Sequence, residues 1–238
     1  MSNFIIHKAE HRGHANHGWL DTFHSFSFAN YYNPGKMHFG VLRVLNDDRI
    51  EGGMGFGMHP HDNMEIITIP IFGGVHHKDS MGNSGVINTG DVQVMSAGTG
   101  IYHSEENANA DKDLMLFQIW IFPDKKNVTP RYDQKTFNIA DRTNKFEQIV
   151  SPMGEETGLN IHQSAWFSLA NFSKNFETNY QIKKEGNGLY VFVIEGNATI
   201  NDQPLSRRDA IGITGVESIT IKSDTDTQIL VMDIPMHI

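Results

Sequence analysis

The chain of 238 residues contains no cysteine. This absence excludes disulfide bonds, thiolate metal ligands and a thiol nucleophile, so a metal ion held by side chains would need histidine and carboxylate ligands. The sequence also has no apolar run near the ~20 residues that a membrane-spanning helix requires. Its first residues, MSNFIIHKAEHRGHANHG, differ from a secretory signal peptide because their apolar run is very short. We therefore expect a cytoplasmic protein with no membrane partner.

Positive charge is scarce as well. The chain has 19 Lys and Arg against 28 Asp and Glu, a formal net charge of -9, and no basic block stands out. A nucleic-acid surface needs clustered positive charge, so direct binding of nucleic acid is not expected. The content of 39% hydrophobic and 20% charged residues is ordinary for a folded globular protein.

Short apolar or alternating segments, separated by Gly, Asn and Asp, dominate the sequence and are typical of an all-β fold. The expected strands cover residues 40–46, 65–72, 91–97, 114–122, 189–196, 218–223 and 228–234. Helical periodicity is weak, and the best helix candidate, residues 163–172, fits a strand equally well.

The two halves of the chain resemble each other. In each half a β-rich run ends at a glycine (Gly74 and Gly196), and a turn then leads to an aspartate (Asp91 and Asp209) that opens another strand. This repeat favours a duplicated small barrel. A polar stretch with two prolines, residues 123–146, suits a linker, and we expect one barrel over residues 1–130 and a second over 131–238.

Two histidine-containing pairs in the first half have the spacing of metal ligands. Residues i and i+2 of a strand share one face, so His59 and His61 of GFGMHPHDNMEI can converge, as can His103 and Glu105 of GTGIYHSEEN. Together they offer three imidazoles and one carboxylate, a set that suits a divalent first-row metal with coordination positions left open. Either pair alone is more simply explained as surface residues of a histidine-rich chain.

The two pairs also resemble the motifs of cupins. The first cupin motif matches Gly53, His59, His61 and Glu65, and the second matches Gly100, His103 and Asn107. More narrowly, long runs of the chain are similar to the pirin family, and most to bacterial pirin-like quercetin 2,3-dioxygenases. These runs are RGHANHGWLDTFHSFSFANYY, GFGMHPHDNMEI, HKDSMGN, GDVQVMSAGTGIYHSE and QIWIFPDKKNVTPRY.

The resemblance implies two cupin jelly-roll barrels, with one divalent metal in the N-terminal barrel. The implied ligands are His59, His61, His103 and Glu105. Glu65, which fits the generic motif, becomes a neighbour of the ligands instead, because parity with His61 places it on the same face. Fe(II) is the expected metal on family grounds, although Cu, Ni, Co, Mn or Zn suit the same ligands. Pro70 and Gly73 depart from the usual pattern of relatives and put the pairing of their strand in doubt.

The resemblance further implies an activity: cleavage of a flavonol such as quercetin by O2 to a depside and carbon monoxide. Glu105 is then both ligand and catalytic base. Three residues are candidates for a pocket wall, although ordinary barrel core explains each of them as well: Phe56, Met95 and Phe117. The rival hypothesis is a non-catalytic, metal-dependent regulatory module that binds a protein, since pirin relatives include such proteins. A monomer is expected in either case.

The remaining histidines and the second barrel are expected to lack a metal role. Counting from the repeat places Gln181, Lys183, Ile221 and Ser223 at the four ligand positions, so the C-terminal barrel is expected to be metal-free. The N-terminal histidines have no ligand spacing and are expected to form structural hydrogen bonds: His14, His17 and His24. The adjacent His76 and His77 face opposite ways on a strand, and His77 is interpreted as part of a turn or pocket edge.

Overall fold

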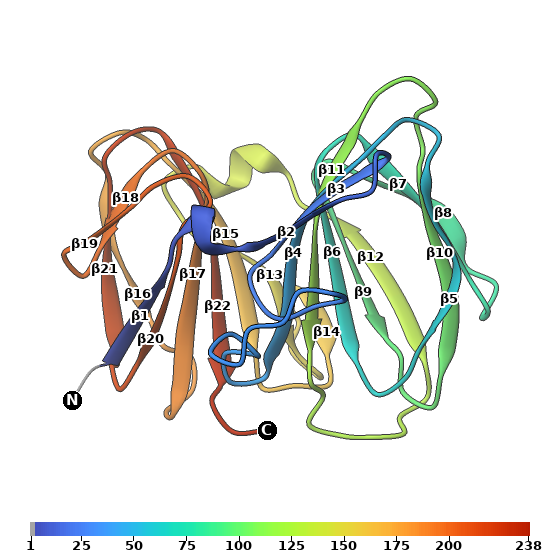
Figure 1. Ribbon diagram of the computed structural model, residues 1–238. Coiled ribbons are helices and arrows are strands. Elements are labelled where there is room, and N and C mark those ends of the chain that lie inside the picture. Colours follow the sequence, from blue (N-terminus) through green and yellow to red (C-terminus); the bar gives the residue numbers. More distant parts are fainter. Residues whose placement is uncertain (1–2) are drawn as a thin grey trace.

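The computed structural model describes residues 3–238 as two β-barrels that lie side by side (Figure 1). Each barrel combines a seven-stranded sheet with a four-stranded sheet. The helical segments of the described chain are two 3-10 turns, η1 (Ala9–His11) and η2 (Ile139–Arg142), and none of its helices is long and apolar enough to cross a membrane. The predicted all-β, tandem cupin architecture is confirmed.

The N-terminal barrel holds its larger sheet in the order β12-β9-β6-β11-β4-β3-β2 and its smaller sheet in the order β5-β10-β7-β8. Its strands are β2 (Gly13–Asn16), β3 (Leu20–His24), β4 (Leu42–Ile50), β5 (Gly55–His61), β6 (Glu65–Phe72), β7 (Gly74–Asp79), β8 (Ser84–Asn88), β9 (Asp91–Ser96), β10 (Ile101–Asn107), β11 (Leu114–Ile121) and β12 (Arg131–Thr136).

The C-terminal barrel has the sheet orders β1-β20-β17-β22-β15-β13-β14 and β16-β21-β18-β19. Its strands are β1 (Asn3–His7), β13 (Glu147–Pro152), β14 (Leu159–Ile161), β15 (Trp166–Phe172), β16 (Glu177–Gln181), β17 (Asn187–Glu195), β18 (Ala198–Ile200), β19 (Gln203–Leu205), β20 (Ala210–Thr214), β21 (Ser218–Ser223) and β22 (Thr227–Pro235). The ambiguous segment 163–172 thus contains a strand, β15.

The duplication is visible in the order of the strands. In the larger sheets, β9-β6-β11-β4 of one barrel corresponds to β20-β17-β22-β15 of the other, and β5-β10-β7-β8 corresponds to β16-β21-β18-β19 in the smaller sheets. Gly74 begins β7 and Gly196 lies two residues before β18, while Asp91 begins β9 and Asp209 directly precedes β20. The repeat read from the sequence therefore marks equivalent turns.

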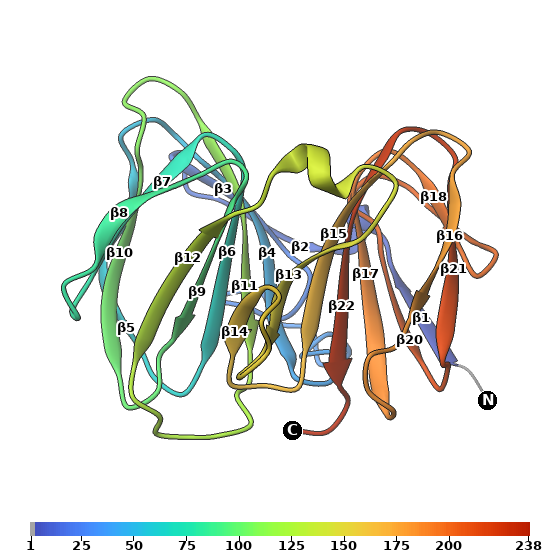
Figure 2. The ribbon, with the colours of Figure 1, turned by 180° about the vertical axis from the view of Figure 1, so that it is seen from behind.

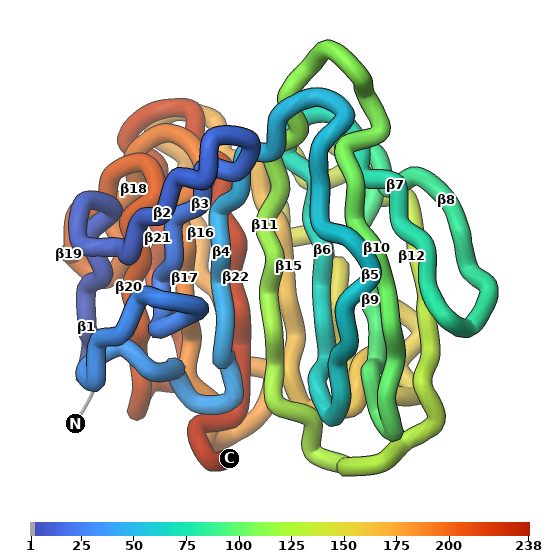
Figure 3. The backbone as a smooth tube through the Cα atoms, turned by 45° about the vertical axis from the view of Figure 1, so that its right-hand side comes forward, coloured from blue at the N-terminus to red at the C-terminus, as the bar shows by residue number. Residues whose placement is uncertain are grey.

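The expected split between residues 130 and 131 needs correction. The N-terminal strand β1 pairs with β20 in the C-terminal barrel, and β12 pairs with β9 in the N-terminal barrel (Figures 1 and 2). The expected linker, residues 123–146, accordingly contains β12 and η2. The N-terminal segment then crosses from the red and orange barrel to the green one (Figure 3). Each barrel is completed at one edge by a strand from outside its own repeat.

The two larger sheets bury a shared apolar core between them. It contains residues of both barrels, among them Ile67, Phe117, Phe192 and Met232, and the rings of Phe117 and Phe192 meet edge to face at 5.3 Å. Phe117 therefore faces the other barrel and is core, not a pocket wall. Removal of this apolar surface from water is the main favourable contribution to the folding free energy of such barrels.

Pro70 is accommodated in β6 because the hydrogen bonding around it is locally relaxed. Strand β9 pairs with β6 only from Glu65 to Thr68, so no hydrogen bond between these two strands requires the N–H group that Pro70 lacks. On the other edge, β11 pairs through a register irregularity next to Leu116, the partner of Pro70. Gly73 follows with φ of +83°, a left-handed conformation that favours glycine. The doubt about this strand is resolved in favour of pairing.

Candidate metal centre

Three histidines meet inside the N-terminal barrel. Strands β5 and β10 are antiparallel neighbours in which His59 lies opposite His103 and His61 lies opposite Ile101. The ring centroids are 4.9 Å apart for His59 and His61, 4.4 Å for His59 and His103, and 4.9 Å for His61 and His103. One nitrogen from each ring lies within 4.8 Å of the other two. Such a cluster can surround a single ion.

The hydrogen bonding and burial of these imidazole rings favour the neutral form of the histidines. His59 donates from Nδ1 to the carbonyl oxygen of Gly57 at 2.8 Å, which leaves its Nε2 lone pair free. Burial, together with the neighbouring imidazoles, lowers the pKa of His61 to about 4 and that of His103 to about 3. Neutral imidazole is the form that binds a metal.

His103 supplies the test of whether a metal fits this site. Its side chain is 1% exposed, and within residues 3–238 neither ring nitrogen has a hydrogen-bond partner. A buried polar group left unpaired costs free energy. A cation held by His59, His61 and His103 would satisfy one of these nitrogens, so the donor set fits a divalent transition metal.

Glu105 lies at the edge of this cluster and is held by other side chains. It is 3% exposed, and it accepts hydrogen bonds from Thr68 at 3.2 Å and from Gln118 Nε2 at 2.8 Å. The pairing of β10 with β5 shifts between His103 and Glu105, which sets Glu105 opposite Phe56. The carboxylate therefore comes within 4.8 Å of donors on His103 and His77, not of the full histidine triad.

His77 joins the site, and its interpretation as a turn or pocket edge is wrong. The side chain is fully buried, its ring lies 5.4 Å from that of His103, and its Nε2 is 3.4 Å from Asp79. The carboxylate of Asp79 is kept ionised by hydrogen bonds that lower its pKa despite burial, chiefly those from Asn83. The i, i+2 pair of His77 and Asp79 has the same form as the two expected pairs, a signal that could have found it.

Glu65 is not a neighbour of the ligands, contrary to expectation. Residues 62–64 turn the chain from the smaller sheet into the larger one, with Asn63 at φ of +43°, so parity counted from His61 no longer applies. Glu65 instead accepts a hydrogen bond from Ser96 at 2.7 Å and faces the C-terminal barrel, where a backbone contact from His162 reaches it. Burial raises the pKa of Glu65 to about 7.

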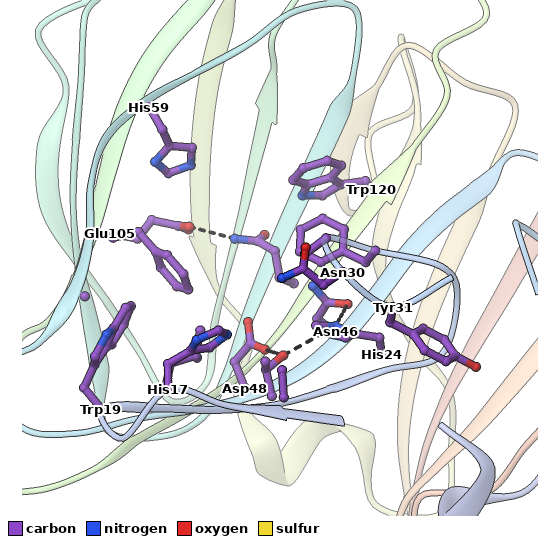
Figure 4. A pocket seen from close by; sticks show the side chains of 18 of the residues that line it. His17, Trp19, His24, Asn30, Tyr31, Asn46, Asp48, His59, Glu105 and Trp120 are labelled. Carbon is purple, nitrogen blue, oxygen red and sulfur yellow. Dashed lines mark hydrogen bonds between the residues drawn. The ribbon is translucent and has the colours of Figure 1, made fainter. Parts of the chain in front are cut away.

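A cavity of about 740 Å³ opens from the histidines toward the N-terminal segment (Figure 4). Its aromatic walls are Trp19, Phe28, Tyr31, Phe56 and Trp120. Trp120 stands edge-on to His61, and Trp19 edge-on to Phe56, with centroids 4.9 and 5.2 Å apart. Of the three wall candidates Phe56 alone lines the cavity; Met95 packs with Ile66 in a small apolar cluster.

The three N-terminal histidines line the same cavity, which their lack of ligand spacing did not reveal. His14 lies 2.7 Å from Asp21, and His24 Nδ1 lies 2.9 Å from the side-chain oxygen of Asn46, so both make the expected structural hydrogen bonds. The lining thus combines a metal cluster, aromatic rings and a few polar groups, as ligand sites commonly do.

The second barrel fills the corresponding space with apolar side chains. Tyr180, Ile219 and Ile221 are buried in its core cluster, and Ser223 is buried beside them. Ile221 lies opposite Thr178 and Ile219 opposite Tyr180, whereas in the first barrel His103 lies opposite His59 and Ile101 opposite His61. The counterparts of His59 and His61 are therefore Thr178 and Tyr180, and the count to Gln181 and Lys183 was wrong by three residues.

Comparisons with known proteins agree with this architecture. The pirin model matches residues 6–121, and a model described as quercetinase C-terminal cupin domain matches residues 148–234. Quercetin 2,3-dioxygenase of Escherichia coli (strain K12) is 44% identical over 230 residues, which cover 97% of this chain and 98% of the relative. A pirin-like protein of Caulobacter vibrioides is 40% identical over 93% of this chain and 95% of its own length.

Solved structures show the same relationship. The crystal structure of the bacterial pirin YhhW from Escherichia coli in complex with nickel(II) is 42% identical, covers 98% of this chain and 99% of its own, and superposes with a TM-score of 0.93. A quercetin 2,3-dioxygenase from Acinetobacter baumannii, at 22% identity over 99% of this chain and 87% of its own, shares the fold with a TM-score of 0.79. The chain belongs to the pirin family.

Proposed function

We propose that the N-terminal barrel is a metal-dependent dioxygenase site that cleaves a flavonol such as quercetin with O2 to a depside and carbon monoxide. One observation carries the proposal: the cluster of His59, His61 and His103 opens directly onto an aromatic-walled cavity of about 740 Å³. Pockets of this size enclose small-molecule ligands. A relative 44% identical over nearly the full chain bears the name quercetin 2,3-dioxygenase.

His59, His61 and His103 would hold the metal, with Glu105 as the fourth ligand after its side chain turns toward them. When bound, a divalent transition metal supplies Lewis acidity that lowers the pKa of a coordinated hydroxyl group. Fe(II) is our proposed metal, and the same donors accept Cu, Ni, Co, Mn or Zn. The nickel complex of the bacterial pirin YhhW is consistent with such a donor set.

Glu105 would take the proton of the flavonol 3-hydroxyl. Its carboxylate lines the cavity together with His59 and His61, and Gln118 and Thr68 fix its orientation. A base must reach the proton that it removes, and an orienting partner keeps it in reach. Trp19, Phe56 and Trp120 present apolar rings that would enclose the flat substrate and exclude water.

The test is turnover by protein reconstituted separately with Fe(II), Cu(II), Ni(II), Co(II) or Mn(II). Loss of quercetin absorbance, O2 uptake and carbon monoxide release are measured together, with an anaerobic sample as the blank. His59→Ala should lose metal and activity, whereas His76→Ala, on the other face of β7, should keep both. Absence of turnover with every metal contradicts the proposal.

The second candidate is a non-catalytic, metal-dependent module that binds another protein. One observation favours it: the outer face of the smaller sheet exposes apolar side chains, among them Met58 at 53% and Tyr102 at 55%. These residues flank the ligand histidines on β5 and β10. A protein that retains metal but turns over no flavonol would support this function.

A further inference from the structure

A row of polar side chains crosses the inner face of the larger sheet in the N-terminal barrel. Thr68 lies opposite Gln118, Gln118 opposite Asn46, and Asn46 opposite His24 in the register of strands β6, β11, β4 and β3. Neighbouring strands are about 4.8 Å apart, so the row runs roughly 14 Å away from Glu105. That length suits a flat molecule of two or three rings.

At the end of the row next to Glu105, the polar side chains form hydrogen bonds with one another. Thr68 donates toward both Glu105 and Gln118, and Gln118 Nε2 donates to Glu105. Because every one of these side chains has a partner, this end serves to fix Glu105.

The far end keeps unused hydrogen-bonding capacity. His24 Nδ1 pairs with the side-chain oxygen of Asn46, and Thr22 donates to one carboxylate oxygen of Asp48. Among residues 3–238, no side-chain hydrogen bond uses the amide nitrogen of Asn46, the second oxygen of Asp48 or Nε2 of His24, and these atoms are accessible from the cavity. All three residues are at most 5% exposed, yet all three line the cavity (Figure 4). Polar atoms that face a cavity from otherwise buried side chains are free to hydrogen-bond a ligand that enters it.

The chemistry of the far end selects the kind of group that it would bind. An amide nitrogen donates, while a carboxyl oxygen and an imidazole nitrogen can accept, so the site offers both roles. Hydroxyl groups both donate and accept, and they match it. Neither Lys nor Arg occurs among the described residues that line the cavity, so a carboxylate or phosphate group would find no cation to pair with.

We propose that Asn46, Asp48 and His24 form a subsite for the hydroxyl groups on a ring of a polyphenol that lies remote from the metal. Phe28 supports this subsite from the side, with its ring 5.3 Å from both His24 and Trp120. The inference rests on the proposed function for the class of ligand, and it makes the polar row the determinant of preference among flavonols.

The test compares quercetin with 3-hydroxyflavone, which lacks the ring hydroxyls beyond the 3-position. Binding to the metal-loaded protein is measured anaerobically by calorimetry, and turnover is measured separately in air. The wild-type protein should bind quercetin about tenfold more tightly, the difference expected for one or two net hydrogen bonds. Asn46→Leu and Asp48→Ala should each bring the ratio of the two dissociation constants close to one by weakening quercetin alone. Asp113→Asn, at a surface ion pair with Arg49, should leave the ratio unchanged.

Equal affinity of the wild-type protein for both compounds overturns the subsite, and this ligand comparison decides the matter even if a variant fails to fold. An unchanged ratio in well-folded Asn46→Leu and Asp48→Ala proteins with normal metal content also overturns it. If neither flavonol is consumed but the binding preference is present and depends on Asn46 and Asp48, the proposed reaction fails while the subsite is supported.

Discussion

Gln118 donates a hydrogen bond from Nε2 to Oε2 of Glu105 at 2.8 Å, and this bond joins the larger sheet of the N-terminal barrel to its smaller sheet. This contact holds a carboxylate that is proposed both to bind the metal and to accept the substrate's proton. Outer partners of this kind commonly change activity by 10- to 100-fold when removed. The position of Glu105 is thus set by the larger sheet, although the residue belongs to the smaller one.

Replacement of Gln118 by Leu should therefore lower kcat for quercetin by about tenfold while metal content stays near the wild-type value. The amide is lost, and Thr68 alone then orients Glu105. Steady-state kinetics and elemental analysis check this expectation. Gln148→Leu, in the C-terminal barrel, is the matched control. A normal kcat in Gln118→Leu would show that the hydrogen bond does not position the base.

His77 should support metal binding. It is buried beside His103 and oriented by Asp79, so His77→Ala removes packing and a donor next to two proposed ligands. We expect at least tenfold weaker metal affinity, measured by competition with a chelator. His76→Ala removes a half-buried histidine from the opposite face of the same strand and should leave affinity unchanged. Equal affinities in the two variants would contradict a role for His77.

Much of the fold follows from local sequence signals, whereas its edges do not. The expected strand at residues 65–72 coincides with β6, and 218–223 with β21, because alternation and flanking turns are local properties. The pairing of β1 with β20 and of β12 with β9 depends on contacts between distant segments. The composition near residue 131 does not indicate that β12 pairs within the N-terminal barrel or that β1 pairs within the C-terminal barrel.

The candidate site shows the same division. His59, His61 and His103 could be found because i, i+2 parity holds within a strand. Glu65 was misplaced because parity does not survive the turn at residues 62–64. The cavity wall from residues 14–31 arises when the N-terminal segment folds across the barrel, and it has no periodic signature in the sequence.

Phe56 should contribute to substrate binding and not to metal binding. It lines the cavity, packs edge-on against Trp19 at 5.2 Å, and lies 6.4 Å from His59. Phe56→Ala removes an aromatic wall, so KM for quercetin should rise by about tenfold, in line with the loss of one buried ring contact. Metal content should be unchanged. A rise in KM of less than twofold would indicate that the flavonol lies elsewhere in the cavity.

Glu65 makes the stability of the protein depend on pH. Burial raises its pKa from 4.5 to about 7 in the folded state, so between these values the folded state binds more protons than the unfolded state. The free energy of unfolding should therefore fall as pH rises from about 4.5 through 7, by up to about 3 kcal/mol from this group. Glu65→Gln removes the titration, and its unfolding free energy should fall less than that of the wild-type protein over this range. Urea unfolding at pH 5 and pH 8 measures the difference, and Glu156→Gln, at an exposed position, serves as the control. The same pH dependence in Glu65→Gln and wild-type protein would show that the buried carboxyl is not its source.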